Sequence, residues 1–355
     1  EQIADAILDW LDTDSQVRQF GAESEYYSAL EPGYAPTNGP LTTLEELLLV
    51  RGVTPWLLFG CDINRNGIID PDEPLSDSLS GVDNSDGSMN QGWAAYLTLY
   101  SAEKNVQSNG QPRININQND MQTLYDQLKQ TLGAEKATFI VAYRQNGPYP
   151  GNAKGVPAAE GTLDLTKKAK AQFNNVLDLI GAKVQVKFQG ENKPKILESP
   201  LPNTSSEISG YLPALMDALT VNPATLIPGR ININQAPRLV LEGIPGMTPD
   251  VVDQIIARRI MDPKDTDSGR KYETWLLSEG ILTLDKMKSL MPFITCGGDV
   301  YRLQSIGYFE DGGVIARIEA IIDGSILPSR VLFWRDISNL GRGYDQETLG
   351  VDGMR

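Results

Sequence analysis

Residues 62–73 have the spacing of oxygen ligands that an EF-hand calcium loop requires; their sequence is DINRNGIIDPDE. Such a loop binds Ca²⁺ through positions 1, 3, 5, 7, 9 and 12, with glycine at position 6 for a sharp turn. Gly67 occupies position 6, and the backbone carbonyl of Ile68 is the predicted ligand at position 7. The predicted calcium ligands are Asp62, Asn64, Asn66, Ile68, Asp70 and Glu73.

The ligand types and the residue after the loop indicate what kind of calcium site this is. Oxygen donors without histidine or thiolate favour Ca²⁺ over Zn²⁺. Pro74 follows the loop directly, so we expect no long exit helix and a single structural clip instead of a paired sensor. Only Asp62, Asp70 and Glu73 are charged, which predicts a modest affinity suited to calcium-rich extracytoplasmic space. The alternative interpretation is a solvated loop rich in Asp and Asn.

A second group of carboxylates lies near the N-terminus, in the segments DWLDTD and GAE. Asp9, Asp12 and Asp14, together with Glu23, are a candidate second metal site. The alternative is that these carboxylates are solvated or cap helices. Two further acidic segments contain turn residues without the loop register and are interpreted as ordinary loops, residues 83–88 and residues 262–269.

The sequence Arg-Ile-Asn-Ile-Asn-Gln occurs twice, at residues 113–118 and 230–235, which indicates a duplicated unit. Each copy is followed by a motif–helix–turn–helix pattern. Asparagine side chains hydrogen-bond nearby backbone and cap helices, so we interpret the motif as the structural entry to a helical unit. The alternative is a contact with a partner. The motif residues singled out are Arg113, Asn115, Asn117, Arg230, Asn232 and Asn234.

Residues 239–259 resemble a helix-hairpin-helix, whose glycine-rich turn binds phosphate through backbone N–H groups. A DNA-binding protein of the competence type is therefore the alternative function. Against it, Glu242, Asp250 and Asp253 flank the turn, the first copy lacks the Gly-Ile-Pro-Gly sequence, and the net charge of −15 repels phosphate. We expect no nucleic acid as a partner.

The composition argues against an enzyme. The 355 residues include no histidine, which excludes Ser-His-Asp and Cys-His catalysis and histidine-ligated zinc. The sequence has no P-loop, nucleotide fingerprint or Gly-x-Ser-x-Gly motif, and no spacing pairs two carboxylates for a hydrolase. Cys61 and Cys296 lie in no CxxC pattern and are either two buried thiols or one long-range disulfide.

The apolar periodicity predicts an α+β fold. Helices are expected at residues 1–12, 42–54, 93–104, 119–132, 165–180, 206–220 and within 230–295. Residues 136–144 fit either a strand or a helix, and residues 182–197 alternate as a hairpin does. From residue 299 a period of two predicts three strands separated by glycine-containing turns.

These elements suggest two domains. The first is a mostly helical domain over residues 1–298, with duplicated SAM-like or helix-hairpin-helix units. The second, residues 299–355, is expected to be an antiparallel sheet. Within the helical domain we expect the repeat units at about 112–145 and 229–295, and a loop and hairpin insertion at about 146–228.

Segments in order along the chain resemble the K class of minor pseudopilins of bacterial type II secretion systems, the general secretion pathway protein K family. They are IADAILDWLDTD at 3–14, GAESEYY at 21–27, LEELLLVRGVT at 44–54 and the asparagine-rich motif at 230–234. The resemblance implies a pilin-like body with an inserted helical domain, so that residues 299–355 are the β-rich part of a pilin-like domain. The long insertion at 146–228 and the duplication depart from the family pattern, which leaves the partner-facing surface open.

The resemblance also implies a function. It predicts a non-enzymatic periplasmic subunit at the tip of the pseudopilus, which initiates or caps the fibre together with minor pseudopilins of the I and J classes. Calcium, as Ca²⁺, is expected to stabilise it. No apolar run reaches the roughly 18 residues that span a bilayer. The sequence begins at Glu1 within a helix-forming stretch, so we expect an inner-membrane helix upstream of this residue.

Overall fold

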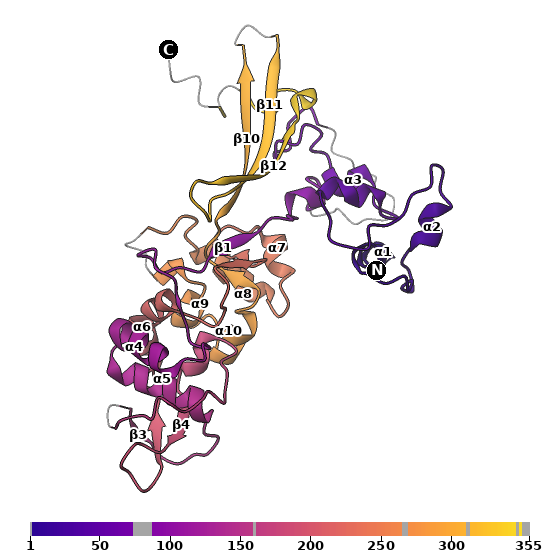
Figure 1. The fold of residues 1–355 in the computed structure, drawn as a ribbon. Helices are drawn as coiled ribbons and strands as arrows, with labels where there is room; N and C mark the ends of the chain where they lie inside the picture. The colour runs from indigo at the N-terminus through magenta and orange to yellow at the C-terminus, as the bar shows by residue number, and fades with distance from the viewer. Residues whose placement is uncertain are drawn as a thin grey trace, which may run out of the picture. The chain divides into compact units, whose positions relative to one another are not determined.

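The computed structural model of the protein describes residues 2–73, 87–158, 161–264, 269–309, 313–345 and 348–349. The chain forms two compact units (Figure 1), one of residues 1–101 with 300–355 and one of residues 102–299. The expected boundary near residue 299 lies beside the second division. The first 101 residues group with the C-terminal strands, a division that the periodicity of the sequence had not indicated.

The N-terminal part of the first unit is built from short helices around an aromatic core. Trp10 and Tyr27 are buried, and their rings meet edge to face with centroids 5.1 Å apart. Leu47 and Leu58 complete this core from the next two helices. The elements are α1 (Gln2–Leu11), α2 (Ser24–Ser28), the 3-10 helix η1 (Leu44–Leu49), α3 (Pro55–Phe59) and the 3-10 helix η2 (Trp93–Ala95).

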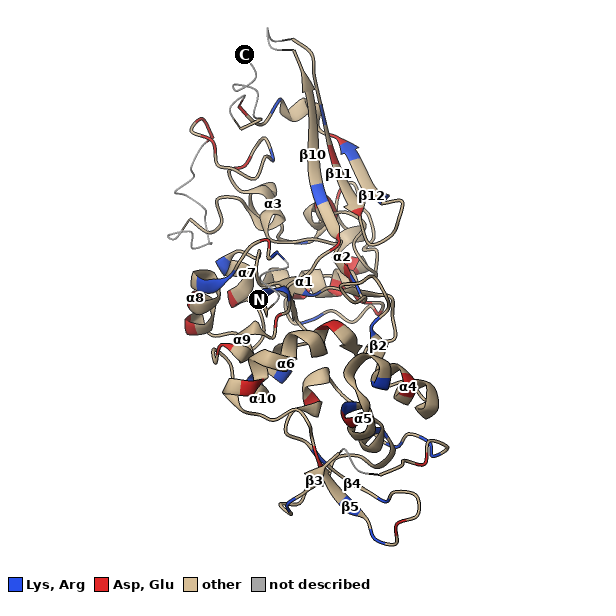
Figure 2. Cartoon of the chain, turned by 90° about the vertical axis from the view of Figure 1, so that its left-hand side faces the viewer, with Lys and Arg blue, Asp and Glu red and all other residues tan. Residues whose placement is uncertain are grey.

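The C-terminal part of the first unit is an antiparallel three-stranded sheet in the order β10–β11–β12, which confirms the three predicted strands. The strands are β10 (Val300–Tyr308), β11 (Ile315–Asp323) and β12 (Arg330–Asp336). Gln304, Glu319 and Arg335 face one another across the three strands. Glu319 forms ion pairs with Arg302 at 2.6 Å and with Arg335 at 2.9 Å (Figure 2).

The second unit holds one continuous apolar core under a set of helices and short strands. Its first half contains β1 (Ala102–Lys104), β2 (Ile114–Asn115), α4 (Met121–Leu132), α5 (Ala134–Asn146), β3 (Val156–Pro157), the 3-10 helix η3 (Val176–Leu179), β4 (Lys183–Val186) and β5 (Lys195–Glu198). Its second half contains α6 (Ser205–Ala218), β6 (Leu219–Thr220), β7 (Leu226–Pro228), β8 (Ile231–Asn232), α7 (Arg238–Glu242), α8 (Pro249–Arg258), α9 (Trp275–Ser278), α10 (Leu284–Leu290) and β9 (Ile294–Thr295).

The mixture of helices and small sheets is α+β, as predicted. The ambiguous residues 136–144 lie in α5, the helix expected at 206–220 is α6, and the expected hairpin is the antiparallel pair β4–β5. Whether the helix pairs are SAM-like and the sheet is pilin-like stays a prediction. The acidic segments expected as loops, residues 83–88 and 262–269, lie partly outside the described residues.

Two predicted helices are wrong and a third is shorter than expected. Residues 165–180 form only the 3-10 turn η3, because the preceding backbone bonds to α5 and to the first motif instead of to itself. The Lys170 N–H donates to the Arg144 carbonyl, and the Phe173 N–H donates to Asn117 Oδ1. Residues 93–104 form η2 and the strand β1, which pairs with β7, and residues 42–54 form only η1.

The two copies of the six-residue motif adopt the same local structure. Each begins with a two-residue strand in parallel pairing, β2 with β6 and β8 with β9. In each copy the first asparagine accepts a hydrogen bond from the backbone of the second, at 2.9 Å for Asn115 and 3.0 Å for Asn232. The second asparagines donate to distant carbonyls, Asn117 to Phe173 and Asn234 to Arg270. The asparagines thus organise the entry to each helix pair.

The two motif arginines have different surroundings. Arg230 pairs with Glu103 and lies 3.4 Å from Glu273, and all three side chains are mostly buried. Burial raises the pKa of the Glu273 carboxyl, and the charge of Arg230 opposes that rise. Arg113 instead lies over the ring of Tyr272 at 6.0 Å from its centroid. Only the second copy therefore compensates buried carboxylates through its arginine.

We expect Arg230→Met to lower the free energy of unfolding by about 3 kcal/mol, because it leaves two buried carboxylates without their cation. The matched change Arg113→Met in the first copy should cost less than about 1 kcal/mol. Urea unfolding followed by circular dichroism compares the two variants. Equal losses would show that the motif arginine has the same role in both copies.

Candidate metal sites

The loop of residues 62–73 is folded by hydrogen bonds from its own backbone to its polar side chains. Asp62 accepts from the N–H groups of Asn66 at 3.0 Å and Gly67 at 2.9 Å. Asn64 Oδ1 accepts from the Asn66 N–H, and Asn66 Oδ1 accepts from the Ile68 N–H at 2.7 Å. These short-range bonds turn the chain so that alternate side chains point to one side.

Gly67 is required by the conformation of the backbone and not by a lack of space. Its φ is +80°, in the left-handed region, and a Cβ there would meet nothing within 4 Å. The turn at this residue lets Asp62 and Asp70 lie on the same side of the loop, where Asp70 Oδ2 accepts from the amides of Asn64 at 2.7 Å and Asn66 at 2.9 Å.

Glu73 closes the loop. One carboxylate oxygen accepts from the N–H groups of Ile63 at 2.8 Å and Asn64 at 3.2 Å, and the other accepts from the Asp70 N–H at 3.0 Å. The last predicted ligand is therefore folded back onto the first residues of the loop. The structure brings together the side chains of five predicted ligands, and Ile68 lies among them in the loop.

The electrostatics of the loop favour a cation. Asp62 and Glu73 are only 8% and 9% exposed. Burial raises the pKa of the Asp62 carboxyl, and the negative charge of Glu73 raises it further. Carboxylate, amide and carbonyl oxygens are the donors that Ca²⁺ prefers. The donor set therefore fits the predicted ion, which would offset the repulsion between buried carboxylates.

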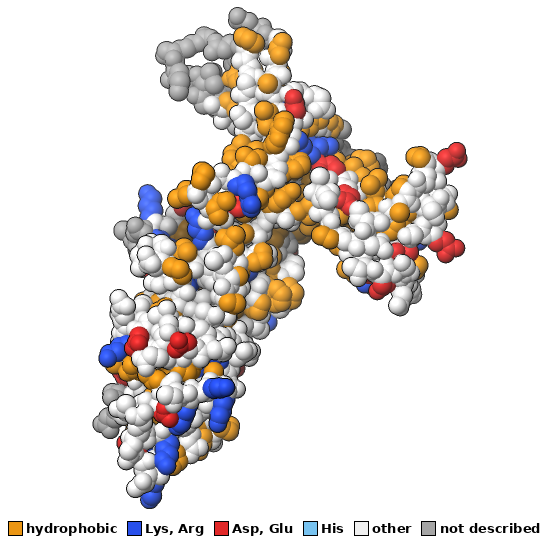
Figure 3. Space-filling view, viewed as in Figure 1, with side chains coloured by type: hydrophobic (Ala, Val, Ile, Leu, Met, Phe, Trp, Pro, Cys, Tyr) orange, Lys and Arg blue, Asp and Glu red, His pale blue; other side chains and the backbone are white. Residues whose placement is uncertain are grey.

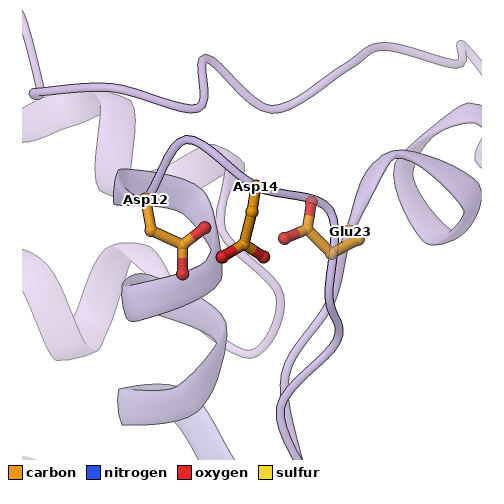
Figure 4. A group of neighbouring side chains, drawn as sticks. All are labelled: Asp12, Asp14 and Glu23. Atoms are coloured by element: carbon orange, nitrogen blue, oxygen red, sulfur yellow. The ribbon is translucent and has the colours of Figure 1, made fainter.

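The N-terminal carboxylates form a second cluster, made of Asp12, Asp14 and Glu23 (Figure 4). One oxygen from each lies within 4.8 Å of the others. Glu23 is 3% exposed, and neither of its carboxylate oxygens has a hydrogen-bond partner in the described part of the chain. Burial raises the pKa of the Glu23 carboxyl, as do the charges of Asp9, Asp12 and Asp14. This cluster has the charge and the free oxygens to hold a hard cation.

Asp9, the fourth predicted member of that group, has a cation of its own. It is fully buried and forms an ion pair with Arg18 at 2.6 Å, while the Arg18 N–H donates to its second oxygen at 3.2 Å. Arg18 also pairs with Asp12. Any side chain at Gly21 would overlap the Asp9 carboxylate, which explains the glycine in GAE. The role of Arg18 was missed, although it is the one basic residue in an acidic segment.

The cysteines take no part in the described metal clusters. Cys61 and Cys296 are both buried free thiols, so of the two alternatives the structure contains the separate thiols. Burial holds the pKa of the Cys296 thiol well above its ordinary value. Among the described residues, no helix has both the length and the apolar character needed to cross a membrane.

Comparison with known proteins identifies relatives of the N-terminal segment. Residues 1–58 match the family described as type II secretion system (T2SS), protein K, in its first domain. Over 57 residues the chain is 44% identical to type II secretion system protein K of Aeromonas hydrophila, which covers 16% of this chain and 17% of that protein. It is 44% identical over 52 residues to the protein of the same description from Klebsiella pneumoniae, covering 15% and 16%.

The chain thus spans about a sixth of the length of the curated relatives it matches. No solved structure matches it. The predicted resemblance is confirmed for residues 1–58, a segment that contains the cluster of Asp12, Asp14 and Glu23. The matched segment ends before the loop at 62–73, so the candidate calcium loop rests on its own residues.

We expect Glu73→Gln to weaken calcium binding at the loop by at least about tenfold, because it removes a charged ligand. Calcium at about 100 times its Kd should stabilise the wild type by about 2.7 kcal/mol relative to chelator. Isothermal titration and thermal unfolding measure both effects. The control is Asp72→Asn, an exposed carboxylate between ligand positions. Equal calcium responses in the two variants would contradict the assignment of Glu73.

At the second cluster we expect the effect of Glu23→Gln to change sign with calcium. In chelator the substitution relieves repulsion among buried carboxylates and should not destabilise the fold. In calcium it should reduce the stability that the ion supplies. Thermal unfolding in both conditions tests this, with the exposed Glu25→Gln as control. The same shift in chelator and in calcium would argue against a cation at this cluster.

Proposed function

We propose that this chain is a subunit of the pseudopilus of a type II secretion system, of the K class of minor pseudopilins. The observation that carries the proposal is the match of residues 1–58 to the first domain of that family. The envelope is where such a system operates, so the subunit would lie in the periplasm, held to the inner membrane by a helix upstream of residue 1. Its work there is assembly and not catalysis.

The finer role that we propose is at the tip of the pseudopilus. There the subunit would initiate or cap the fibre together with minor pseudopilins of the I and J classes. A tip subunit must expose a surface that binds other subunits. In the described part of the first unit, the C-terminal sheet offers such a surface.

One face of that sheet is apolar and exposed. Side chains alternate along a strand, so Leu303, Ala320 and Trp334, which lie opposite one another, share the face away from Gln304 and Glu319. Tyr301, Val331 and Trp334 are 57%, 55% and 64% exposed. Figure 3 shows hydrophobic side chains over these strands. An apolar face of this kind is typical of a surface that binds a protein partner.

Calcium would serve this assembly role by stabilising the first unit. Bound Ca²⁺ supplies two positive charges to clustered carboxylates. The residues proposed to hold it at 62–73 are those whose oxygens converge in the loop, and Asp12, Asp14 and Glu23 would hold a second ion. Binding to the folded state alone raises the free energy of unfolding. Modest affinity suffices where calcium is plentiful.

The comparisons give no support to the alternative of DNA binding. The surface of the hairpin formed by α7 and α8 also argues against it. Arg238, the first residue of α7, pairs with Glu242 at 3.2 Å and with Asp253 at 2.5 Å. A cation already held by two carboxylates is poorly placed to neutralise a phosphate.

Co-purification tests the proposal. The full-length protein, expressed with minor pseudopilins of the I and J classes, should be recovered with them from detergent extracts. Trp334→Glu should weaken recovery at least tenfold, because it places a charge on the apolar face. Met261→Glu, an exposed apolar residue in the second unit, is the control. Failure of the wild type to co-purify with either class would contradict the proposed function.

A further inference from the structure

The C-terminal sheet contacts the backbone of the candidate calcium loop. From β11, Arg317 donates to the carbonyl of Asn64 at 2.8 Å and to the carbonyl of Arg65 at 3.2 Å. From β10, Gln304 donates to the same Arg65 carbonyl at 2.9 Å. Beyond the sheet, the Tyr344 hydroxyl donates to the carbonyl of Asn66 at 2.8 Å. Three consecutive carbonyls of the loop are therefore held by side chains from the C-terminal part of the chain.

Arg317 is the centre of these contacts. Its side chain is fully buried, and its guanidinium hydrogen-bonds to backbone carbonyls and to Gln304 Oε1 at 2.6 Å and 3.1 Å, which are neutral acceptors. A buried guanidinium is costly unless negative charge lies near it. Asp62 and Glu319 are the carboxylates that act on it electrostatically. The loop is therefore part of what makes this buried charge tolerable.

The charges of the loop and Arg317 are complementary when an ion is present. The three carboxylates Asp62, Asp70 and Glu73 exceed the charge of one Ca²⁺ by one negative charge, and the guanidinium supplies the remaining positive charge. Arg317 binds carbonyls on the backbone of the loop, whereas the proposed ligands turn their oxygens inward. The cation and the guanidinium therefore stabilise the same loop from different sides.

The contacts also fix an unfavourable backbone conformation. Arg65, whose carbonyl accepts from both sheet residues, has φ +56°, a left-handed conformation that is rare for a residue other than glycine. Its own guanidinium lies over the ring of Phe59 at 3.9 Å from the centroid. A loop held in this shape before the ion arrives has less conformational entropy to lose on binding.

We propose that Arg317 is a positioning residue for the calcium loop, so that ion binding at 62–73 and docking of the C-terminal sheet on that loop are thermodynamically linked. This rests on the proposed calcium site. Linkage is reciprocal: if the docked sheet raises the affinity for calcium, then calcium holds the sheet in place by the same factor.

Two glycines provide a test that leaves Arg317 and the loop unchanged. Gly341 and Gly343 have nearly the same left-handed backbone, with φ of +76° and +77°. A Cβ at Gly343 would overlap the guanidinium of Arg317, whereas a Cβ at Gly341 would meet nothing within 4 Å. Alanine at either position carries the same backbone strain, but only Gly343→Ala displaces the guanidinium.

The experiment is a calcium titration of the whole chain by calorimetry, in a Glu23→Gln background so that only the loop is titrated. Gly343→Ala and Arg317→Gln should raise Kd about tenfold, which corresponds to about 1.4 kcal/mol. Arg317→Lys, which keeps the charge without the fork, should lie between these and the wild type. Gly341→Ala should bind as the wild type does. Thermal unfolding in chelator selects the variants that fold.

Amide hydrogen exchange supplies a second readout. Calcium should slow exchange in β11 of the wild type, and this effect should vanish in Arg317→Gln. Wild-type affinity in Arg317→Gln, or equal affinities in Gly343→Ala and Gly341→Ala, would overturn the linkage while leaving the calcium site in place. If the parent binds no calcium that Glu73→Gln abolishes, the calcium site itself is overturned, and the linkage with it.

Discussion

A buried carboxylate needs a positive charge close by, and this requirement organises both units of the protein. Arginine meets it in several places: Arg18 for Asp9, Arg230 for Glu103, and Arg335 for Glu319. Two other groups of buried carboxylates have no such partner among the described residues. They are the loop around Asp62 and Glu73 and the cluster around Glu23, and they are where the chemistry of the ligands fits a metal ion.

The duplicated motif shows how the same requirement separates identical sequences. The asparagines of both copies make equivalent backbone hydrogen bonds, so the local shape depends on the motif alone. The arginines differ because their neighbours come from other parts of the chain. Glu103 and Glu273 surround Arg230, whereas the ring of Tyr272 lies beside Arg113. Duplication preserved the fold of the entry, and one copy acquired an electrostatic task.

Local signals made the loop and the regular elements predictable. The twelve-residue spacing identified the side chains that converge, and strong periodicity identified α4, α6 and the strands β10 to β12. Residues 165–180 have helical spacing, but their backbone bonds to α5 and to the first motif, which no local pattern reveals. The same holds for Arg317, which lies 253 residues from Asn64, and for the grouping of the first 101 residues with the last strands.

The order of the segments along the chain has a consequence for folding. The first unit is made from two segments, and residues 102–299 lie between them in the sequence. At the ends of that second unit the Asp299 N–H donates to the Ala102 carbonyl at 2.9 Å, and the Lys104 N–H donates to Asp299 at 2.7 Å. Once the second unit has folded, its entry and exit are adjacent, so the chain entropy lost on joining the two outer segments is that of a short connection. The inner unit can fold as soon as it is synthesised, whereas the outer one must wait for the last strand to emerge.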